Sequence, residues 1–454
     1  MPRLSNIKKV FLVGIGGIGM SGLARYFKFM GKEVYGYDKT LTTLTTKLER
    51  EGIQIHYEDK IEHIPKDIDL VVYTPAIPKN HVQFNYFLSN GYPLFKRSQV
   101  LGMLSKEYEV LAVAGTHGKT TTSTLLTHIL LTSGIDCTAF LGGISENLQS
   151  NFLFGKSKWM VVEADEYDRS FLTLYPMHSV ITSVDPDHLD IYGDEQEMHK
   201  TFVQFASQNN KAGTVFIRHG LGIINNLIED NIGFSTYGIE AGEVFASQIN
   251  LQNGTFHFDY NGKDLLFRNL KISLPGRHNI ENAVAAISLA LLAGAQEKSV
   301  REALESFKGI KRRFEFIHKG DMVYIDDYAH HPGELAAAIQ AARELYPQKT
   351  IRGIFQPHLF SRTRDFAVGF AEELDKLDEI WLMDIYPARE EPIPGITSQT
   401  ILELMKNPNK HLFSREQLLE VIQQLQDGVL MTLGAGDIDT MVEPISKIFK
   451  SKTV

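Results

Sequence analysis

The sequence predicts an α/β protein built from three domains. Short apolar runs typical of buried parallel strands alternate with longer segments of helical periodicity along the 454 residues, and such alternation favours βαβ units. At roughly 150 residues per domain, this length favours three domains. Polar and charged residues gather directly after the apolar runs, where parallel sheets bind their ligands. We expect the domains to span residues 1–106, 107–310 and 311–454.

Composition narrows the classes of function. The chain has 46 basic and 55 acidic residues and a net charge of −9, with no long basic run, which argues against a nucleic-acid partner. It contains neither 18 consecutive apolar residues nor a signal peptide, so we expect a soluble, cytoplasmic protein without a membrane partner. The single cysteine, Cys137, lies in an apolar run and is expected to be buried.

The first domain opens with an apolar strand over residues 8–13 and the turn Gly14-Ile15-Gly16-Gly17-Ile18-Gly19. A helix is expected over 20–30, and the next strand, 33–37, ends at Asp38. This G-x-G-x-x-G pattern is typical of a Rossmann-like domain and, taken alone, favours NAD. The diphosphate of a UDP-sugar would fit the same helix N-terminus. A later strand ends at Thr74. The residues expected at a diphosphate are Gly14, Gly16, Gly17, Ile18, Gly19, Asp38 and Thr74.

The second domain carries the most informative motif of the chain. An apolar strand over 108–114 leads into Gly115-Thr116-His117-Gly118-Lys119-Thr120-Thr121, and a helix is expected over 120–132. Backbone N–H groups and a helix N-terminus converge in such a turn, which predicts ATP bound in a P-loop mononucleotide-binding domain. We expect Lys119 to offset phosphate charge and the Thr120 hydroxyl to bind Mg²⁺. The spacing, G-x-x-G-K-T, is shorter than usual.

Three later residues extend this predicted site. Glu163 ends an apolar strand, a position that suits a Mg²⁺ ligand. His188 follows another strand among carboxylates, so it is either a second metal ligand or an ordinary turn residue. Asn282 stands before a helix expected over 283–293 and has the amide needed to read an adenine edge, whereas Asn279 is expected only to cap that helix.

The third domain repeats the alternation of strands and helices. A strand over 322–325 leads into Asp326-Asp327-Tyr328-Ala329-His330-His331-Pro332. Another strand, over 350–356, leads into Pro357-His358-Leu359-Phe360-Ser361-Arg362. Histidine and arginine after strand ends suit the binding of phosphate and carboxylate anions, with ordinary surface charge as the alternative.

Taken in order, these motifs resemble those of the Mur ligases, which use ATP to form the amide bonds of the peptidoglycan precursor. The resemblance covers essentially the whole chain. It rests on six segments: 115–121, 163–166, 187–190, 276–282, 312–315 and 326–332. Within the family, the opening over 14–22 is similar both to the branch that adds L-alanine to UDP-N-acetylmuramate and to the branch that recycles murein tripeptide. The segment over 356–365 favours the L-alanine branch.

The resemblance implies a three-domain fold in which the third domain is again Rossmann-like. It also implies that ATP phosphorylates the lactyl carboxylate of UDP-N-acetylmuramate, and that L-alanine attacks the acyl phosphate with release of ADP and phosphate. Mg²⁺, or Mn²⁺ in its place, would accompany ATP. Thr120 and Glu163 would hold one metal ion, and His188 would hold a second.

The resemblance also assigns the remaining contacts. Asn282, Arg313 and Asp327 would lie at the nucleotide. Tyr328, His330, His358 and Arg362 would lie at the incoming amino acid. The catalytic set implied is Lys119, His188, His330 and Arg362. A guanidinium can pair a carboxylate through two hydrogen bonds, so Arg362 suits the alanine carboxylate, and His330 is a candidate base for the amine.

Two departures from the family pattern stand out. Leu359 occupies a position where several L-alanine ligases have arginine, and Lys200 is no convincing match for the carbamoylated lysine of sister ligases, so we expect no such modification. Two other classes of function stay open: an NAD-dependent oxidoreductase, and a nucleotide-gated binding protein without turnover. The expected assembly is a monomer or a weak homodimer.

Overall fold

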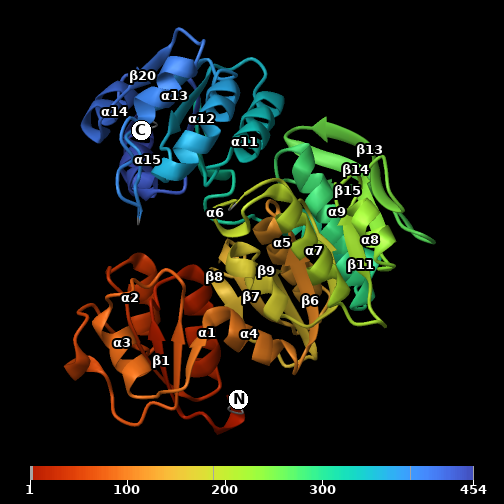
Figure 1. The fold of residues 1–454 in the computed structure, drawn as a ribbon. Coiled ribbons are helices and arrows are strands. Elements are labelled where there is room, and N and C mark those ends of the chain that lie inside the picture. Colours follow the sequence, from red (N-terminus) through yellow and green to blue (C-terminus); the bar gives the residue numbers. More distant parts are fainter. Residues whose placement is uncertain (1–3, 188, 389, 453–454) are drawn as a thin grey trace. The chain divides into compact units, whose positions relative to one another are not determined.

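A computed structural model describes residues 4–187, 189–388 and 390–452 and confirms the predicted α/β class (Figure 1). The chain divides into two compact units. Unit 1 comprises Met1–Ile249, Phe258–Lys271 and Glu281–Phe307, and unit 2 comprises Asn250–His257, Ile272–Ile280 and Lys308–Val454.

Unit 1 begins with a five-stranded parallel sheet in the order β3-β2-β1-β4-β5, the arrangement expected of a Rossmann-like domain. The strands are β1 (Lys9–Val13), β2 (Glu33–Tyr37), β3 (Gln54–His56), β4 (Leu70–Tyr73) and β5 (Leu94–Lys96). The helices are α1 (Ile18–Phe29), α2 (Thr43–Arg50), α3 (Val82–Ser89) and α4 (Arg97–Ser105), with single 3₁₀ turns η1 (Leu4–Asn6) and η2 (Ile61–His63). The strand order reverses between β1 and β4, so ligands are expected beyond the ends of these two strands.

A second sheet has ten strands in the order β15-β14-β13-β12-β11-β10-β6-β9-β7-β8. They are β6 (Glu109–Ala114), β7 (Thr138–Ser145), β8 (Ser150–Leu153), β9 (Trp159–Ala164), β10 (Pro176–Ile181), β11 (Val215–Arg218), β12 (Ser235–Ile239), β13 (Val244–Gln252), β14 (Thr255–Asn261) and β15 (Leu266–Ile272). The helices are α5 (Lys119–Thr132), α6 (Leu189–Tyr192), α7 (Glu195–Ser207), α8 (Ile224–Glu229), α9 (Arg277–Leu292) and α10 (Glu297–Ser306), with the 3₁₀ segment η3 (Tyr167–Thr173). Strand β6 pairs in parallel with both β9 and β10, so the ends of these three strands meet.

The third sheet, in unit 2, has the order β16-β17-β21-β18-β19-β20, and only β16 runs antiparallel to its neighbour. The strands are β16 (Glu315–His318), β17 (Met322–Asp327), β18 (Ile351–Phe355), β19 (Glu379–Leu382), β20 (Lys410–Leu412) and β21 (Gly428–Leu433). The helices are α11 (Pro332–Leu345), α12 (Phe360–Leu374), α13 (Ser398–Leu404), α14 (Arg415–Ile422) and α15 (Val442–Lys452), with the 3₁₀ turn η4 (Asp437–Met441).

One helix begins earlier than the sequence pattern indicated. Helix α9 starts at Arg277, directly after Gly276, whose φ of +87° turns the chain into the helix. Asn279 therefore lies inside the first turn, where its Nδ2 donates to the carbonyl of Pro275 at 2.6 Å. The expectation that Asn279 caps a helix over 283–293 was wrong, because the glycine allows the helix to begin six residues sooner.

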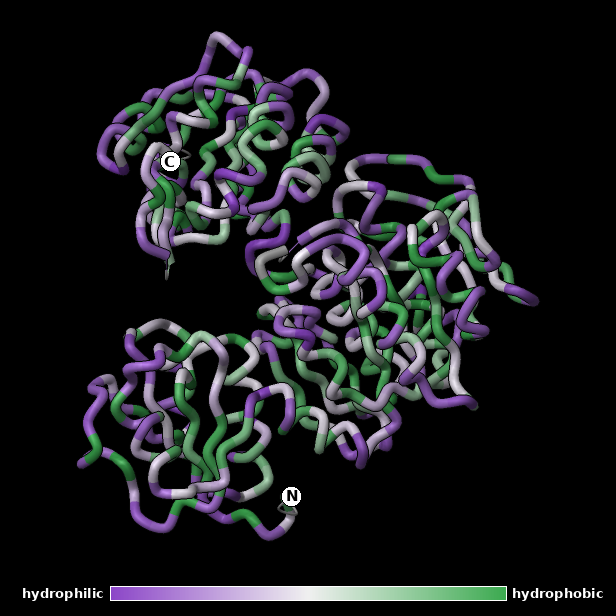
Figure 2. Tube along the Cα trace, viewed as in Figure 1, coloured by the Kyte–Doolittle hydropathy of each residue, from purple (hydrophilic) through white to green (hydrophobic). Residues whose placement is uncertain are grey.

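Burial follows the apolar runs of the sequence. Figure 2 shows hydrophobic colouring along the strands and hydrophilic colouring in many of the connecting loops. In β6, the five residues from Val110 to Ala114 are fully buried. Cys137 is buried, as predicted, and burial raises the pKa of its thiol to about 12. Within the described part of the chain, every helix is too short or too polar to cross a lipid bilayer.

Candidate active site

The predicted phosphate loop joins β6 to α5 and needs glycine at two positions. Gly115 has a φ of +135°, and Gly118, the N-cap of α5, has a φ of +82°. L side chains are strained at these angles. A Cβ atom at Gly118 would also lie 2.6 Å from Oδ1 of Asn282. These glycines keep the N-terminus of α5 open to an anion.

Lys119 is the first residue of α5, and oxygen atoms surround its ammonium group. Its Nζ donates to the carbonyls of Gly115 at 2.5 Å and Thr116 at 3.1 Å, and lies 2.8 Å from Glu166. Burial alone would lower the pKa of Lys119, but Glu166 and two further carboxylates outweigh it and raise that pKa. Burial raises the pKa of the Glu166 carboxyl to about 7, against the attraction of Lys119. The sequence pattern placed Glu166 among the carboxylates at a predicted Mg²⁺ site but singled out Glu163, so its contact with Lys119 was not anticipated.

The two predicted metal ligands of this region lie together. The Thr120 hydroxyl donates to Glu163 Oε1 at 3.1 Å, and the Gly142 N–H donates to Glu163 Oε2 at 2.9 Å. A Cβ atom at Gly142 would overlap the Glu163 carboxylate, so a side chain there would displace that carboxylate. A hydroxyl beside a carboxylate at a helix N-terminus is an oxygen-rich pair that suits Mg²⁺. Thr121 follows, half-buried in the first turn of α5.

Residues directly after β10 hold the phosphate loop in place through hydrogen bonds. The Thr116 and Ser183 hydroxyls lie 2.9 Å apart, and the His117 N–H donates to Ser183 Oγ at 2.6 Å. The Thr182 hydroxyl donates to the carbonyls of Ala114 and His117. Sequence reasoning missed Thr182 and Ser183, although a Thr-Ser pair directly after an apolar run was a signal available to it.

Three further predictions for this domain have different outcomes. Asn282 is buried in α9 and accepts a hydrogen bond from the Thr122 hydroxyl at 3.2 Å, so it contacts α5, and its adenine contact stays a prediction. His188 lies outside the described residues. Lys200 is exposed on α7, with Nζ 3.8 Å from Glu197.

In the first domain, Asp38 closes the glycine turn. Its Oδ2 accepts from the Gly16 N–H at 2.7 Å, and its Oδ1 accepts from the Thr40 N–H at 3.2 Å. A Cβ atom at Gly16 would come within 2.8 Å of Asp38 Oδ2. The carboxylate that a dinucleotide enzyme would offer to a ribose is therefore engaged with the backbone of the turn.

A cavity of about 590 Å³ extends from this turn to the acidic end of β9. All seven residues predicted for a diphosphate line it: Gly14, Gly16, Gly17, Ile18, Gly19, Asp38 and Thr74. From the second domain, Gly142, Glu163 and Asp165 line it as well. The structure thus brings the predicted diphosphate turn and the predicted metal carboxylate to one cavity.

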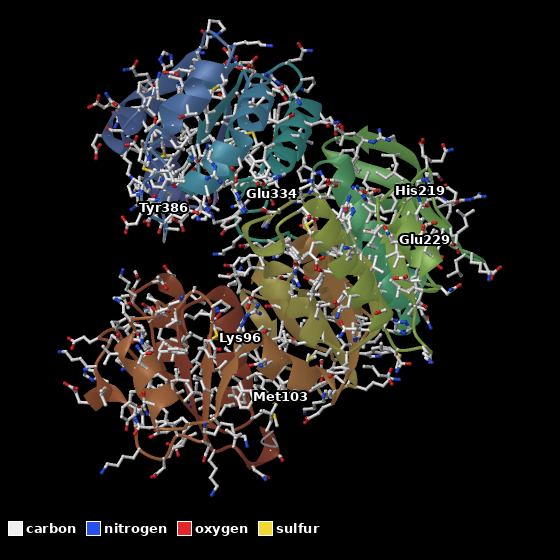
Figure 3. The ribbon with its side chains drawn as sticks, in the orientation of Figure 1. Lys96, Met103, His219, Glu229, Glu334 and Tyr386 are labelled. Carbon is white, nitrogen blue, oxygen red and sulfur yellow. The ribbon has the colours of Figure 1, made fainter. Side chains whose placement is uncertain are left out.

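Arg97 joins the two sides of this cavity and was missed by the sequence analysis. Its Nη2 donates to Asp165 Oδ2 at 3.1 Å, and a Cβ atom at Gly19 would lie 2.8 Å from its Nη1. The neighbouring Lys96, labelled in Figure 3, pairs with Asp168 at 2.7 Å. Both cations stand where the short strand β5 meets α4. A cation at the end of a strand was a signal by which the sequence could have indicated them.

In unit 2, Asp327 organises the start of the cluster after β17. Its Oδ2 accepts from the Phe314 N–H and its Oδ1 from the Ala329 N–H, each at 2.7 Å. Burial raises the pKa of Asp327 to about 6, partly offset by Arg313. The guanidinium of Arg313 lies 5.3 Å from the centre of the Tyr328 ring. The structure therefore brings the predicted Arg313, Asp327 and Tyr328 together.

His330 lies next to Glu334, a residue that the sequence analysis did not single out. His330 Nδ1 is 2.8 Å from the Tyr328 carbonyl oxygen and 3.2 Å from Glu334 Oε2. Burial lowers the pKa of His330, Glu334 opposes that effect, and Arg362 adds to it. The net result is a lowered pKa, so the imidazole is mostly neutral near pH 7, the form that can accept a proton.

The loop between β18 and α12 supplies the other predicted amino-acid contacts. The His358 ring stacks on that of Tyr386 with centroids 5.9 Å apart; Figure 3 labels Tyr386 and Glu334. Leu359 adopts a φ of +69°, and its N–H donates to the Tyr386 carbonyl at 3.0 Å. Arg362 lies in the first turn of α12, and its charge acts on His330.

Comparison with known proteins adds family assignments along the chain. Residues 9–109 match the model of the Mur ligase family catalytic domain, and residues 113–290 match the Mur ligase middle domain. Residues 312–436 match the Mur ligase glutamate ligase domain. Together the three models span most of the chain.

Full-length relatives and solved structures agree with these models. The chain is 49% identical to a UDP-N-acetylmuramate--L-alanine ligase of Flavobacterium psychrophilum, over 99% of this chain and 100% of the relative. A protein of the same name from Cytophaga hutchinsonii is 46% identical, over 99% of this chain and 98% of the relative.

Among solved structures, the UDP-N-acetylmuramate-alanine ligase MurC of Thermotoga maritima has a TM-score of 0.84 at 28% identity, covering 98% of this chain and 99% of that one. A murein peptide ligase of Psychrobacter arcticus shares the fold, with a TM-score of 0.73 at 23% identity and coverage of 97% and 98%. The chain belongs to the Mur ligase family.

Proposed function

We propose that this chain is an ATP-dependent ligase that joins L-alanine to the lactyl carboxylate of UDP-N-acetylmuramate. The reaction would pass through an acyl phosphate and release ADP and phosphate, as a step in peptidoglycan precursor synthesis. The observation that carries the proposal is the single cavity lined both by the first glycine turn and by Glu163. A diphosphate anchored at the turn would direct its sugar towards the acidic end of β9. The full-length relatives of that name support the same activity.

The nucleotide would supply the phosphoryl group, and Mg²⁺ or Mn²⁺ would neutralise its charge. Thr120 and Glu163 fit one such ion, because both present oxygen at the N-terminus of α5. Lys119 would offset the charge that develops on the transferred group. We propose His188 for a second metal ion. We also propose that Gly115, Thr116, His117, Gly118, Thr121, Asn282, Arg313 and Asp327 bind ATP.

The incoming amino acid would be held by the cluster of unit 2. Arg362 would pair with its carboxylate through two hydrogen bonds. His330 would accept the proton that the amine must lose, and Tyr328 and His358 would line the site. Leu359 contributes no guanidinium, so we assign recognition of the carboxylate to Arg362, whereas the nearby Arg364 pairs with Asp365.

Two alternative activities have weaker support. The recycling of murein tripeptide would use the same first turn, but the full-length relatives quoted above are named for L-alanine. An NAD-dependent oxidoreductase would use Asp38 for a ribose, but the full-length relatives quoted above are named as ligases. It would also leave Lys119 and Glu163 without a task.

Release of ADP tests these activities directly. The chain is incubated with ATP and Mg²⁺, with and without UDP-N-acetylmuramate, and with either L-alanine or the tripeptide L-Ala-D-Glu-meso-diaminopimelate. Turnover that requires both the UDP-sugar and L-alanine would support the proposal. Turnover with the tripeptide in place of L-alanine would replace it with the recycling activity, and no ADP in any mixture would favour a binding protein.

Three organisational proposals accompany this function. We place the domain boundaries at 106/107 and 310/311, as the sequence analysis does. We propose that the protein works in the cytoplasm, where ATP and nucleotide sugars are made, without a nucleic-acid or membrane partner. We propose a monomer or a weak homodimer, which sedimentation at several protein concentrations would test.

A further inference from the structure

Glu334 lies between two groups with different proposed tasks. Its Oε1 is 3.3 Å from Arg313 Nη1, and its Oε2 is 3.2 Å from His330 Nδ1. The side chain is only 14% exposed, so neither contact is screened as a surface pair would be. Arg313 is proposed for the nucleotide and His330 for the amine. One carboxylate thus contacts both.

The contacts at Nδ1 define the tautomer of neutral His330. The Tyr328 carbonyl, 2.8 Å away, can only accept a hydrogen bond. Glu334 Oε2 accepts one from the His330 backbone N–H at 3.0 Å, so it too presents an acceptor to the ring. Two acceptors facing one ring nitrogen require that nitrogen to carry the proton, which leaves the lone pair on Nε2.

We propose that Glu334 is a positioning residue that holds His330 as the Nδ1–H tautomer, so that Nε2 accepts the proton of the incoming amine. Arg313 orients the carboxylate by occupying its other oxygen. The pairing resembles, in its physical logic, any base whose far nitrogen is oriented by a carboxylate. The inference about catalysis rests on the proposed function, whereas the tautomer itself does not.

The charged groups around His330 determine the direction in which its pKa shifts. The groups that act on His330 are Glu334 on α11, Arg362 on α12 and Arg313 before β16, with the rings of Tyr328 and His358 beside it. Glu334 is the charged member of this set that favours the imidazolium, and the Tyr328 carbonyl adds to its effect. The charge of Glu334 therefore raises the basicity of His330, which the two arginines lower.

The structural alternative is that Glu334 only caps a helix. It is the third residue of α11 and accepts from the His330 N–H, one residue before the N-cap His331 that a capping-box glutamate would bond. Glu334→Gln separates the two roles, because the amide oxygen can still accept from the backbone while the charge is lost. Glu344→Gln is the matched control, since it removes the same charge from the same helix, where Glu344 accepts a solvent-exposed hydrogen bond from Gln340.

The first measurement is ¹⁵N NMR of histidine-labelled full-length protein across pH. For His330 in the wild type we expect a protonated Nδ1 and an unprotonated Nε2 near neutral pH. In Glu334→Gln we expect a His330 pKa lower by about one unit, the scale expected when a nearby opposite charge is removed. An unchanged tautomer and pKa in Glu334→Gln would overturn the proposal, whether or not the protein is a ligase.

The second measurement is the pH profile of kcat/KM for L-alanine. A base must be unprotonated, so a lower His330 pKa moves the acid limb of the profile to lower pH, by about one unit in Glu334→Gln. We expect kcat to fall about tenfold, while Glu334→Asp, which restores the charge, recovers part of both changes. A profile equal to that of Glu344→Gln and the wild type would reduce Glu334 to a helix cap. Absence of turnover in all variants would reject the proposed function and leave the NMR result to decide the tautomer.

Discussion

The two glycine-rich turns of unit 1 follow central parallel strands and open a helix, yet they are built differently. In the turn after β1, only Gly14 has a positive φ, and the carboxylate of Asp38 closes the loop. In the turn after β6, Gly115 and Gly118 both have positive φ, and the helix begins with Lys119. The first turn brings no cation of its own, whereas the second brings one that is held among carboxylates.

This difference suits the turn after β1 to anchoring a diphosphate and the turn after β6 to taking part in phosphoryl transfer. An anchored diphosphate keeps its charge throughout, so backbone N–H groups suffice to hold it. A phosphoryl group in transfer changes its charge distribution, and a fixed ammonium beside it stabilises that change. We expect loss of the Lys119 charge in the second turn to affect rate, and loss of the Asp38 carboxylate at the first turn to affect affinity or folding.

The largest expected effect comes from Lys119→Met. Turnover should fall about 10³-fold, the loss typical when one preorganised charged or donor group is removed from a reacting centre, while UDP-N-acetylmuramate binding measured by calorimetry stays near that of the wild type. Lys158→Met is the matched control, because Lys158 is exposed and pairs with Glu109 at the opposite end of β6. Near-normal turnover in Lys119→Met would remove the distinction between the turns.

A pair of alanine substitutions compares the backbones of the turns. Gly118→Ala places a side chain at a φ of +82° and near Asn282, and should cost about 2 kcal/mol of stability. Gly17→Ala has a φ of −64°, with 3.6 Å to the nearest atom, and should change stability by less than about 0.5 kcal/mol. Urea unfolding midpoints of both variants check this. Equal losses of stability in the two variants would mean that both turns tolerate a side chain equally well.

Lys119 of the second turn contacts a carboxyl, that of Glu166 after β9, which titrates near neutrality. Glu166 has a pKa of about 7, raised by burial, so it is mostly protonated at pH 6 and ionised at pH 8. An ionised Glu166 competes with phosphate for Lys119, so ATP affinity should fall as pH rises from 6 to 8, by about tenfold, a typical coupling between two sites. Calorimetric titration of ATP would measure it. Glu166→Gln should flatten the profile, and a wild-type affinity independent of pH would contradict the competition.

Among the side-chain contacts of the two turns, the smallest expected loss comes from the Asp38 carboxylate. Asp38→Asn keeps one acceptor for the backbone and loses the other, which should cost about 1 kcal/mol of stability. Because Asp38 serves the turn, we expect neither the wild type nor Asp38→Asn to bind NADH in a fluorescence titration. Tight NADH binding that depended on Asp38 would instead make the first turn a dinucleotide site.

Much of the fold was predictable because local sequence and tertiary environment agree. Strand β6 is a continuous apolar run and is fully buried over its last five residues, so its pattern carried the information. The strands β13 to β15 were not anticipated, although Asn253 and Gly254 signalled a hairpin, because Ile249 and Leu251 alternate with polar residues before them and three aromatic residues alternate after them. Asn253 and Gly254 both adopt positive φ, 51° and 77°, as a type I′ turn requires.

Some residues of the candidate site could be predicted from the sequence, and others could not. Residues in contiguous motifs, such as Lys119 and Thr120, could be predicted from spacing alone. Arg97 and Asp165 come from segments 68 residues apart, and only the folded chain reveals that they meet. Glu334 was missed for another reason, because a glutamate in the first turn of a helix is common and its second contact, to Arg313, depends on tertiary packing.

One wall of the cavity in unit 1 has a consequence for inhibition. Gly142 cannot accept even a methyl group without displacing the Glu163 carboxylate, and Gly16 faces the same obstacle at Asp38. A cell under selection by an inhibitor that contacted this backbone could change either glycine only by moving the carboxylate beside it. Resistance by substitution at Gly142 would therefore carry a cost in activity, because it would disturb the proposed metal ligand Glu163.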